Sequence, residues 1–334
     1  MPKVKYEASA FLSPLVNLNG NRIINTNWAD ILHSAYTVGK SSNKYVYKHG
    51  LYSMYEVLYR SLIVRSNLKE NYQGYLVKTN AYKDLDASEK SAVSFFIGLT
   101  SAKLLSEHLL GIKWLLHYDK HYRRLNIVNS SKRSRPDLVG RLPASVLGQN
   151  GWVIIEAKGR TGKKTDGLIQ KAKDQTRLVH SIQNSTNLLR IASVSYFYKN
   201  NFNIYWEDPE GENDERRDLI KIEFSNSDLI NRTYGLVQSI IVSSKENRIE
   251  TLNGNRFIVT DIDILDISLG IKQEIHDMLK LEEYNRIIEI DNNIGTNEYN
   301  NSEGNLYIGN DGVLVKCGET WSSEEMKKEP DERL

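Results

Sequence analysis

The hydrophobic pattern of the middle of the chain predicts a long helix near residue 88. Residues 88–110 carry apolar side chains at 92, 95, 96, 99, 105 and 109. Asp86 precedes Glu89 by three residues, the spacing of a capping box, in which each residue satisfies an unpaired amide at the helix start. Gly111 is a suitable C-terminal stop. We therefore expect one well-capped helix over this segment.

Short apolar runs and a second helical stripe follow this helix. The second helix is predicted over 167–183, where Leu168, Ala172, Gln175, Val179 and Ile182 share one face. Strands are predicted at 113–119, 125–129, 137–142, 152–158, 190–198 and 202–206. The order helix, strands, helix, strand is typical of an α/β sandwich with a mixed sheet.

The flanking regions contain further elements. A helix is predicted over 51–64, and tight hairpins are predicted at 17–24 and 251–259, each turning at Asn-Gly. A third hairpin is predicted over 304–318, turning at residues 310–312, and the charged segment 207–218 is a plausible boundary. We divide the chain into an N-terminal accessory region (1–86), a core (87–206) and a C-terminal accessory region with a loose tail (207–334).

Composition narrows the class of protein. Cys317 is the only cysteine, so neither an internal disulfide nor a cysteine zinc cluster is possible. No segment has the pattern of a secretory signal, and no apolar stretch approaches the ~18 residues that span a bilayer. We expect a cytoplasmic protein without a membrane partner.

The distribution of charge is uneven although the net charge is only +2. Residues 131–177 carry 11 Lys or Arg and 4 Asp or Glu, a local charge of +7. The other residues carry 33 basic and 38 acidic side chains, a charge of −5. Such a basic band is a candidate footprint for a polyanion, and the alternative is an ordinary solvated face.

The strand at 152–158 ends by presenting a carboxylate and an ammonium two residues apart. Side chains alternate across a strand, so Ile154, Glu156 and Lys158 share one face. A carboxylate binds Mg²⁺, and an ammonium stabilises an anionic oxygen. A metal site needs a second carboxylate, and Asp137 stands nineteen residues upstream, after Pro136 at the start of the preceding strand.

The triplet alone has low specificity. Glu325-Met-Lys327 has the same spacing, and a second Pro-Asp occurs at 330–331. Only the first copy follows an apolar strand, has Pro-Asp upstream and lies in the basic band. The alternative interpretation is a strand-end ion pair, worth about 0–1 kcal/mol on a surface.

Pro136-Asp137, the nineteen-residue step and Glu156-Ala-Lys158 together resemble the PD-(D/E)xK nuclease superfamily, which has the restriction-endonuclease-like fold. The resemblance covers about residues 87–206. It implies that Asp137 and Glu156 bind Mg²⁺ (or Mn²⁺ as a substitute), with help from the carbonyl of Ala157. It also implies that Lys158 positions or activates the water that hydrolyses a phosphodiester, leaving a 5′-phosphate and a 3′-hydroxyl.

Two further residues are candidates for the same site. Many members of the superfamily carry a glutamate on the helix before the sheet, and Glu107 is the candidate here, with Glu56 as a weaker one. The alternative is an ordinary surface glutamate. Several similar nuclease families place a glutamine on the helix after the lysine, which makes Gln175 a candidate. The alternative is a buried structural amide, since a glutamine in an apolar stripe needs hydrogen-bond partners.

Basic residues around the motif are candidates for contacts with the phosphate backbone, which position a nucleic acid without reading its sequence. The alternative is again solvated charge. These candidates are Arg133, Arg135, Arg160, Lys163, Lys164 and Lys171.

The sequence thus favours a cytoplasmic, Mg²⁺-dependent endonuclease that acts on DNA. The resemblance to stand-alone prokaryotic nucleases implies a role in restriction or anti-phage defence. The accessory regions leave room for a homodimer interface or a partner ATPase or helicase. Three alternatives stay open: a non-catalytic nucleic-acid-binding or assembly subunit, an RNA nuclease, and, least favoured, a small-molecule hydrolase.

Overall fold

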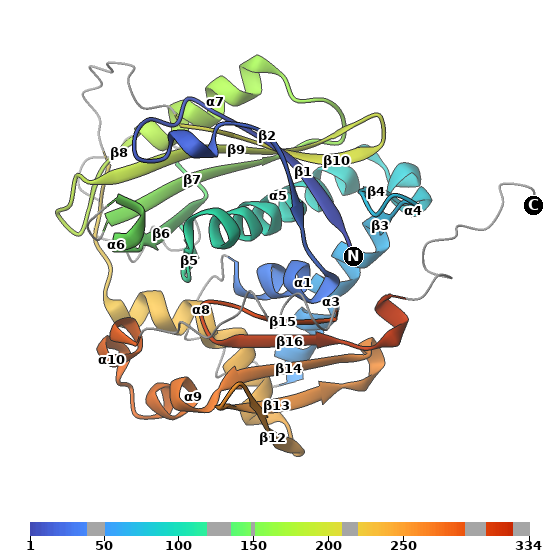
Figure 1. Cartoon of the computed structure of the whole chain (residues 1–334), viewed down its shortest axis with the longest axis vertical. Coiled ribbons are helices and arrows are strands. Elements are labelled where there is room, and N and C mark those ends of the chain that lie inside the picture. The colour runs from blue at the N-terminus through green and yellow to red at the C-terminus, as the bar shows by residue number, and fades with distance from the viewer. Residues whose placement is uncertain (39–50, 119–134, 148–150, 209–219, 291–304, 323–334) are drawn as a thin grey trace, which may run out of the picture.

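A computed structural model describes residues 1–38, 51–118, 135–147, 151–208, 220–290 and 305–322. Two sheets form the framework, with helices packed around and between them (Figure 1). The predicted strand at 125–129, the charged loop near 209–218 and the C-terminal tail lie outside the described residues. Within those residues, no helix has the length and apolar character that crossing a bilayer requires.

The central sheet is mixed and contains nine of the described strands. Seven of them follow the order β2-β1-β10-β9-β7-β6-β5, and β4 pairs with both β10 and β3. Their bounds are β1 Lys3–Ser9, β2 Gly20–Asn25, β3 Leu68–Glu70, β4 Leu76–Lys78, β5 Leu115–His117, β6 Leu138–Leu142, β7 Gly151–Gly159, β9 Leu188–Tyr198 and β10 Asn201–Glu207.

Strand β7 carries the Glu-Ala-Lys motif and lies inside this sheet. It runs antiparallel to β6 and parallel to β9. Val153, Ile154 and Ile155 are fully buried because helices cover both faces here. Helix α5 (Ala87–Leu110) packs on one face and α7 (Asp166–Arg177) on the other (Figure 1).

The second sheet follows the order β12-β13-β14-β16-β15. Helix α1 (Trp28–Thr37) packs against α5 and against β15 and β16, and so joins the two sheets (Figure 1). The strand bounds are β12 Asn247–Leu252, β13 Asn255–Ile262, β14 Ile267–Lys272, β15 Leu306–Ile308 and β16 Val313–Cys317. The remaining helices are α3 Leu51–Asn67, α4 Asn80–Asp84, α6 Ala144–Leu147, α8 Asn226–Ser243, α9 Gln273–Lys280 and α10 Tyr284–Glu289, with 3₁₀ turns η1 Val16–Leu18, η3 Asp263–Leu265 and η4 Glu319–Trp321.

Several local predictions are confirmed. Asp86 and Glu89 form a full capping box at the start of α5, and Gly111 ends it in the left-handed region at φ 62°. The hairpin β12–β13 turns at Asn253 and Gly254, both with positive φ. The helix over 51–64 and the hairpin over 304–318 are also present as α3 and β15–β16. The chain is a mixed α/β protein with a central mixed sheet flanked by helices.

The tight hairpin predicted at 17–24 is wrong. Asn19 has φ −61° and closes a short 3₁₀ turn, and Gly20 is the first residue of β2. Strand β2 pairs instead with β1 across a ten-residue loop, residues 10–19. Of the two residues predicted to have a positive φ, only Gly20 does, at 113°.

The helix predicted over 167–183 is shorter in the structure than the sequence pattern predicts. Helix α7 stops at Arg177, and Val179–Ile182 form strand β8, which pairs in parallel with β11 (Ile220–Ile222). Val179 and Ile182 are β-branched and have this distant strand as a partner, so the segment forms a strand although its apolar spacing is helical.

The predicted division at residue 86 does not coincide with a break in the sheet, because β1 pairs with β10.

Candidate active site

The register of β6 and β7 places Asp137 opposite Glu156. Leu138 pairs with Ile155, so the residue before β6 faces the residue after Ile155. The Asp137 amide donates to Glu156 Oε2 at 3.0 Å, and the Ala157 amide donates to Asp137 Oδ2 at 3.0 Å. Each carboxylate is thus held by the backbone of the other strand, which brings the two predicted ligands together.

Lys158 completes the motif. Its Nζ forms an ion pair with Glu156 Oε1. The Glu156 side chain is 1% exposed and that of Lys158 is 26% exposed, so the ammonium lies between the buried carboxylate and solvent. The predicted sharing of one strand face by these two residues is confirmed.

The two carboxyl groups of the site resist being ionised at the same time. Burial, and secondly the nearby charge of Asp137, raise the pKa of Glu156 to about 8, although Lys158 and the Asp137 amide act in the opposite direction. Two carboxylates therefore share one ammonium in a place that water reaches poorly. Such mutual repulsion is relieved when a cation binds between the two groups.

The donor set fits a hard divalent cation. Carboxylate and carbonyl oxygens are the ligands that Mg²⁺ and Mn²⁺ prefer. Each carboxylate oxygen has two acceptor positions, so the observed hydrogen bonds leave capacity for a metal. In a strand, the amide and carbonyl of one residue point to the same edge. Because the Ala157 amide points to Asp137, the Ala157 carbonyl faces the same side and is suited to join the ligands.

Gln175 lies beside the segment that carries Asp137. Its Nε2 donates to the carbonyl of Arg135 at 3.0 Å, two residues before the carboxylate. Helix α7 therefore places a glutamine next to the segment that carries Asp137, as the sequence predicts. The contact is to the backbone, so Gln175 holds the approach to β6 in place.

Glu107 does not join this site, and the prediction that placed it there is wrong. Helix α5 contacts the end of β7 through Gly98, where an added Cβ would come within 3.3 Å of the Lys158 carbonyl carbon. Glu107 is nine residues further on, roughly 13 Å along the helix axis. It accepts a hydrogen bond from the Asn310 amide at 2.7 Å and lies 3.0 Å from Lys103 Nζ. Glu56, the weaker candidate, pairs with Arg60 on α3.

Glu107 belongs instead to a buried ionic cluster with His33, Asp311 and Lys103. His33 Nε2 lies 2.9 Å from Asp311 Oδ1, and His33 Nδ1 lies 3.6 Å from Glu107 Oε2. Burial lowers the pKa of His33, but the charges of Asp311 and Glu107 outweigh it and raise the pKa overall. The ligand atoms of His33, Glu107 and Asp311 lie within 4.8 Å of one another. The Lys103 ammonium and an imidazole whose pKa is raised lie beside the two carboxylates, so their charge is offset from within the protein.

The predicted basic contacts are spread over several surfaces. Arg133 lies outside the described residues, and Arg135 is half-buried three residues before β6. Arg160, Lys163 and Lys171 are exposed. Lys164 is half-buried, forming an ion pair with Glu7 at 2.8 Å and lying over the Tyr205 ring at 3.5 Å. The basic loop therefore packs partly on the sheet.

No sequence pattern considered above predicts the contribution of the first strand. Lys3, Lys5 and Glu7 alternate with buried Val4 and Tyr6, which is the period-two signal of a half-buried strand. This alternation would have predicted a strand at the N-terminus. The buried pair of Lys173 with Glu207, at 2.7 Å, also depends on a strand far along the chain and has no local signal.

The glycine after the motif permits close packing of α5 on β7. A Cβ at Gly159 would lie 1.8 Å from the Ser94 carbonyl oxygen. We expect Gly159→Ala to destabilise the protein by about 1–3 kcal/mol, because the helix and strand must separate. Gly162→Ala is the control, since no atom lies within 4 Å of its added Cβ. Urea unfolding measures both, and equal stabilities would show that the contact relaxes at no cost.

Comparison of the chain with protein-family models, curated proteins and solved structures gives no match. The assignment of the site therefore depends on its geometry and on the motif.

Proposed function

We propose that this protein is a metal-dependent nuclease with a restriction-endonuclease-like core that hydrolyses phosphodiester bonds of DNA. The observation that carries the proposal is the cross-strand pair of Asp137 and Glu156 beside Lys158. An isolated surface ion pair would not require a carboxylate that is 1% exposed and repelled by a second one. Strongly perturbed carboxyl groups of this kind are typical of functional sites.

Each residue of the site has a distinct role in this proposal. Asp137, Glu156 and the Ala157 carbonyl would hold Mg²⁺, and the ion would supply positive charge to the phosphate and acidity to a bound water. Lys158, half-exposed at the rim, orients the attacking water and stabilises the charge on the phosphate oxygens. Gln175 keeps the segment before Asp137 in place through the Arg135 carbonyl.

The charge around the site favours a polyanionic substrate over a small phosphoester. Arg160, Lys163 and Lys171 are exposed within the basic band and are available for phosphate contacts. The preference for DNA, the role in anti-phage defence and an assembly as homodimer or with an ATPase derive from the resemblance alone. A non-catalytic binding subunit is the second candidate, and the cost of the buried carboxylate pair weighs against it.

Lys158→Ala is expected to reduce cleavage by about 100-fold, because the lysine orients the water and balances developing charge. The measurement uses plasmid DNA, linear duplex DNA, single-stranded DNA and RNA, each with Mg²⁺, Mn²⁺ or EDTA. Lys280→Ala, an exposed lysine on α9, is the matched control. Binding of the substrates by wild type and variant without any cleavage would assign the protein to the binding class. Cleavage that needs Mg²⁺ but is unaffected by Lys158→Ala would place the chemistry elsewhere.

A further inference from the structure

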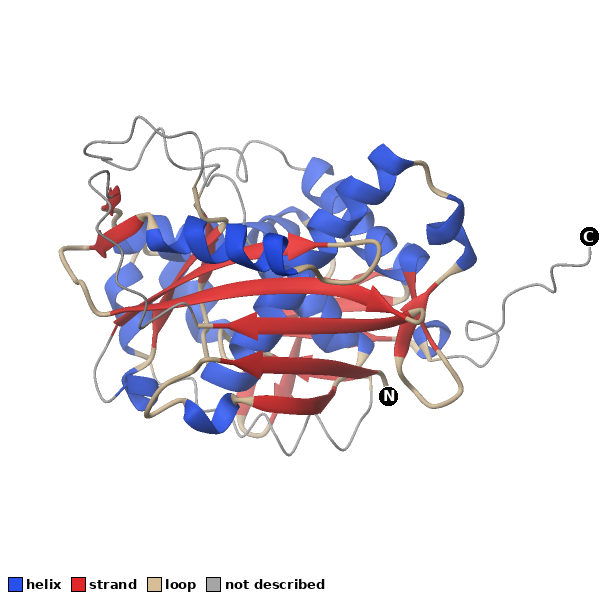
Figure 2. Ribbon diagram, turned by 90° about the horizontal axis from the view of Figure 1, so that it is seen from above, coloured by secondary structure: helices blue, strands red, loops and turns tan. Residues whose placement is uncertain are grey.

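Among the described residues, no helix packs on β1, β2 and β10 over one face of the central sheet. Helix α7 packs on β7 and β9, where Ile169 contacts Val194 and Tyr205. Beyond them, β10, β1 and β2 extend the sheet, and Figure 2 looks onto these strands with α7 to one side of them. A shallow groove of about 440 Å³ lies over this part of the sheet.

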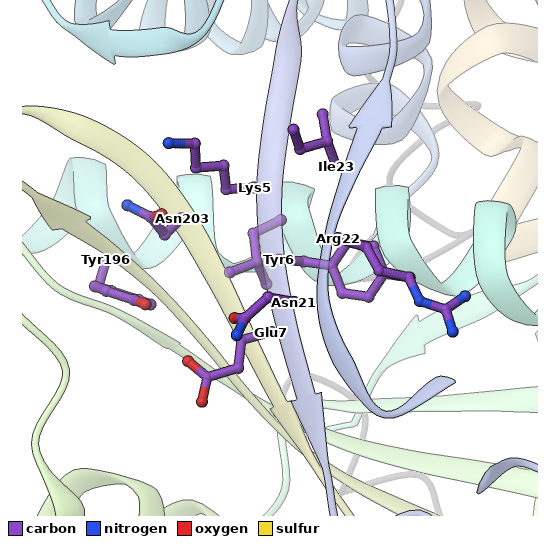
Figure 3. Close-up of a pocket in the computed structure, with 9 residues that line it drawn as sticks. Lys5, Tyr6, Glu7, Asn21, Arg22, Ile23, Tyr196 and Asn203 are labelled. Carbon is purple, nitrogen blue, oxygen red and sulfur yellow. The ribbon is translucent and has the colours of Figure 1, made fainter. Parts of the chain in front are cut away.

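The uncovered face has polar and aromatic side chains in a cross-strand row. Lys5 pairs with Ile23 on β2 and with Asn203 on β10, and Asn203 pairs with Tyr196 on β9. Cross-strand partners project to the same side, so Lys5, Asn203 and Tyr196 share this face, as Figure 3 shows. Arg22 pairs with Tyr6 and belongs to the opposite face.

Lysine ammonium groups lie over tyrosine rings along the same face. Lys5 Nζ is 4.5 Å from the Tyr75 ring centroid, and Lys163 Nζ is 5.1 Å from that of Tyr198. Tyr198 is 43% exposed. Lys3, Lys164 and Lys199 make further contacts of this kind, at 3.5–6.0 Å. We call this surface the lysine–tyrosine face: Lys3, Lys5, Lys163, Lys164, Lys199, Tyr75, Tyr196 and Tyr198.

The lysine–tyrosine face has an excess of positive charge. Glu7, a carboxylate that lines the groove, forms an ion pair with Lys164 at 2.8 Å. Lys3, Lys5, Lys163 and Lys199 have no ion-pair partner among the described residues. The face is therefore complementary to an anion that is long enough to contact several lysines at once.

This face lies on the same side of the sheet as Lys158, and helix α7 covers the residues between them. Lys158 pairs with Val194, Val194 with Tyr205, and Tyr205 with Glu7, so all four residues lie on one sheet face. Three strand spacings separate Lys158 from Glu7, a distance of roughly 14 Å. The loop that follows Lys158 carries Lys163 and leads directly onto the face.

We propose that the lysine–tyrosine face binds a single-stranded stretch of nucleic acid next to the phosphodiester that is cut, an inference that rests on the proposed nuclease function. Tyr196 and Tyr198 offer rings for base stacking, and the lysines contact the phosphates. Bases expose their flat sides only when they are unpaired, so the face selects a single strand over a duplex. The shared chemistry covers DNA and RNA.

Fluorescence anisotropy of the full chain carrying Lys158→Ala, in EDTA, tests the proposal without cleavage. The probes are a labelled oligo(dT), an oligo(U) and a DNA duplex of equal length. Adding Tyr196→Ala is expected to weaken single-strand binding by about 5- to 100-fold, whereas Tyr196→Phe keeps the ring and is expected to retain it. Adding Lys5→Ala is expected to lower the slope of log K against log salt by about 0.7, since one phosphate contact is lost.

The controls separate this inference from the proposed activity. Adding Lys280→Ala, a lysine far from the face, should leave the affinity unchanged, and thermal unfolding checks that each variant folds. Unchanged affinity in folded Tyr196→Ala and Lys5→Ala proteins would overturn the inference even if the wild type cleaves DNA. Preferential binding to the duplex, or to vesicles of anionic lipid with no oligonucleotide binding, would also overturn it. Single-strand binding that depends on Tyr196 in a protein that never cleaves would retain the binding face and reject the nuclease.

Discussion

Glu156→Gln is expected to reduce metal-dependent cleavage by about 10³-fold while making the metal-free protein more stable. The loss of cleavage follows because glutamine is a weaker metal ligand than a carboxylate, and the charge that stabilises the transition state depends on that metal. The gain in stability follows because the buried Glu156 carboxylate is desolvated and repelled by Asp137. We expect the free energy of unfolding at pH 8 to rise by about 1–3 kcal/mol.

The gain should depend on pH in a defined direction. The pKa of Glu156 is raised in the folded protein from 4.5 to about 8, so the folded state binds the proton more tightly than the unfolded state does. The contribution of Glu156 to the stability of the metal-free wild type is therefore greatest below pH 4.5. It is lost as the pH rises to about 8. The difference between Glu156→Gln and the wild type should be small at pH 4.5 and greatest near pH 8.

Urea unfolding in EDTA at several pH values measures this difference. Glu223→Gln, an exposed glutamate after β11, is the control and should change stability by less than about 0.5 kcal/mol at every pH. Added Mg²⁺ should stabilise the wild type and not Glu156→Gln, because only the wild type retains the full ligand set. A variant that is less stable than the wild type at all pH values would show that the carboxylate serves the fold.

The parts of the fold that the sequence predicts correctly have local causes. The capping box of Asp86 and Glu89 and the Asn253-Gly254 turn depend on residues within a few positions of one another. The apolar run of β7 likewise indicates a strand buried on both faces. The position of Asp137 opposite Glu156 was predictable because the motif spans only two neighbouring strands.

The errors arise where a distant partner decides the structure. Val179 and Ile182 continue a helical stripe in the sequence, but in the structure they pair with strand β11, some forty residues later. Strand β1 pairs with β10, about two hundred residues away, and no local pattern names that partner. The sequence predicts Glu107 as a residue of the active site, but it contacts the turn at Asn310, 203 residues later. These contacts decide the surroundings of a side chain, but the neighbouring residues in the sequence do not indicate them.

Glu107→Ala is expected to destabilise the protein by about 3–5 kcal/mol and to leave the cleavage rate per folded molecule unchanged. Removing the Glu107 carboxylate leaves the buried Lys103 ammonium without its ion-pair partner, in a place that water does not reach. Urea unfolding gives the stability. Glu283→Ala, which breaks the exposed pair with Arg286, is the control and should cost no more than about 1 kcal/mol.

The milder change Glu107→Gln keeps an acceptor for the Asn310 amide and provides a folded protein for the activity measurement. Loss of cleavage in folded Glu107→Gln by 100-fold or more would return Glu107 to the catalytic residues. A double-mutant cycle then tests the charge balance itself. Lys103→Met combined with Glu107→Gln should cost less than the sum of the single changes, because the double variant leaves neither member of this pair as an unpaired buried charge. Additive costs would mean that Glu107 acts through the Asn310 hydrogen bond and not through its charge.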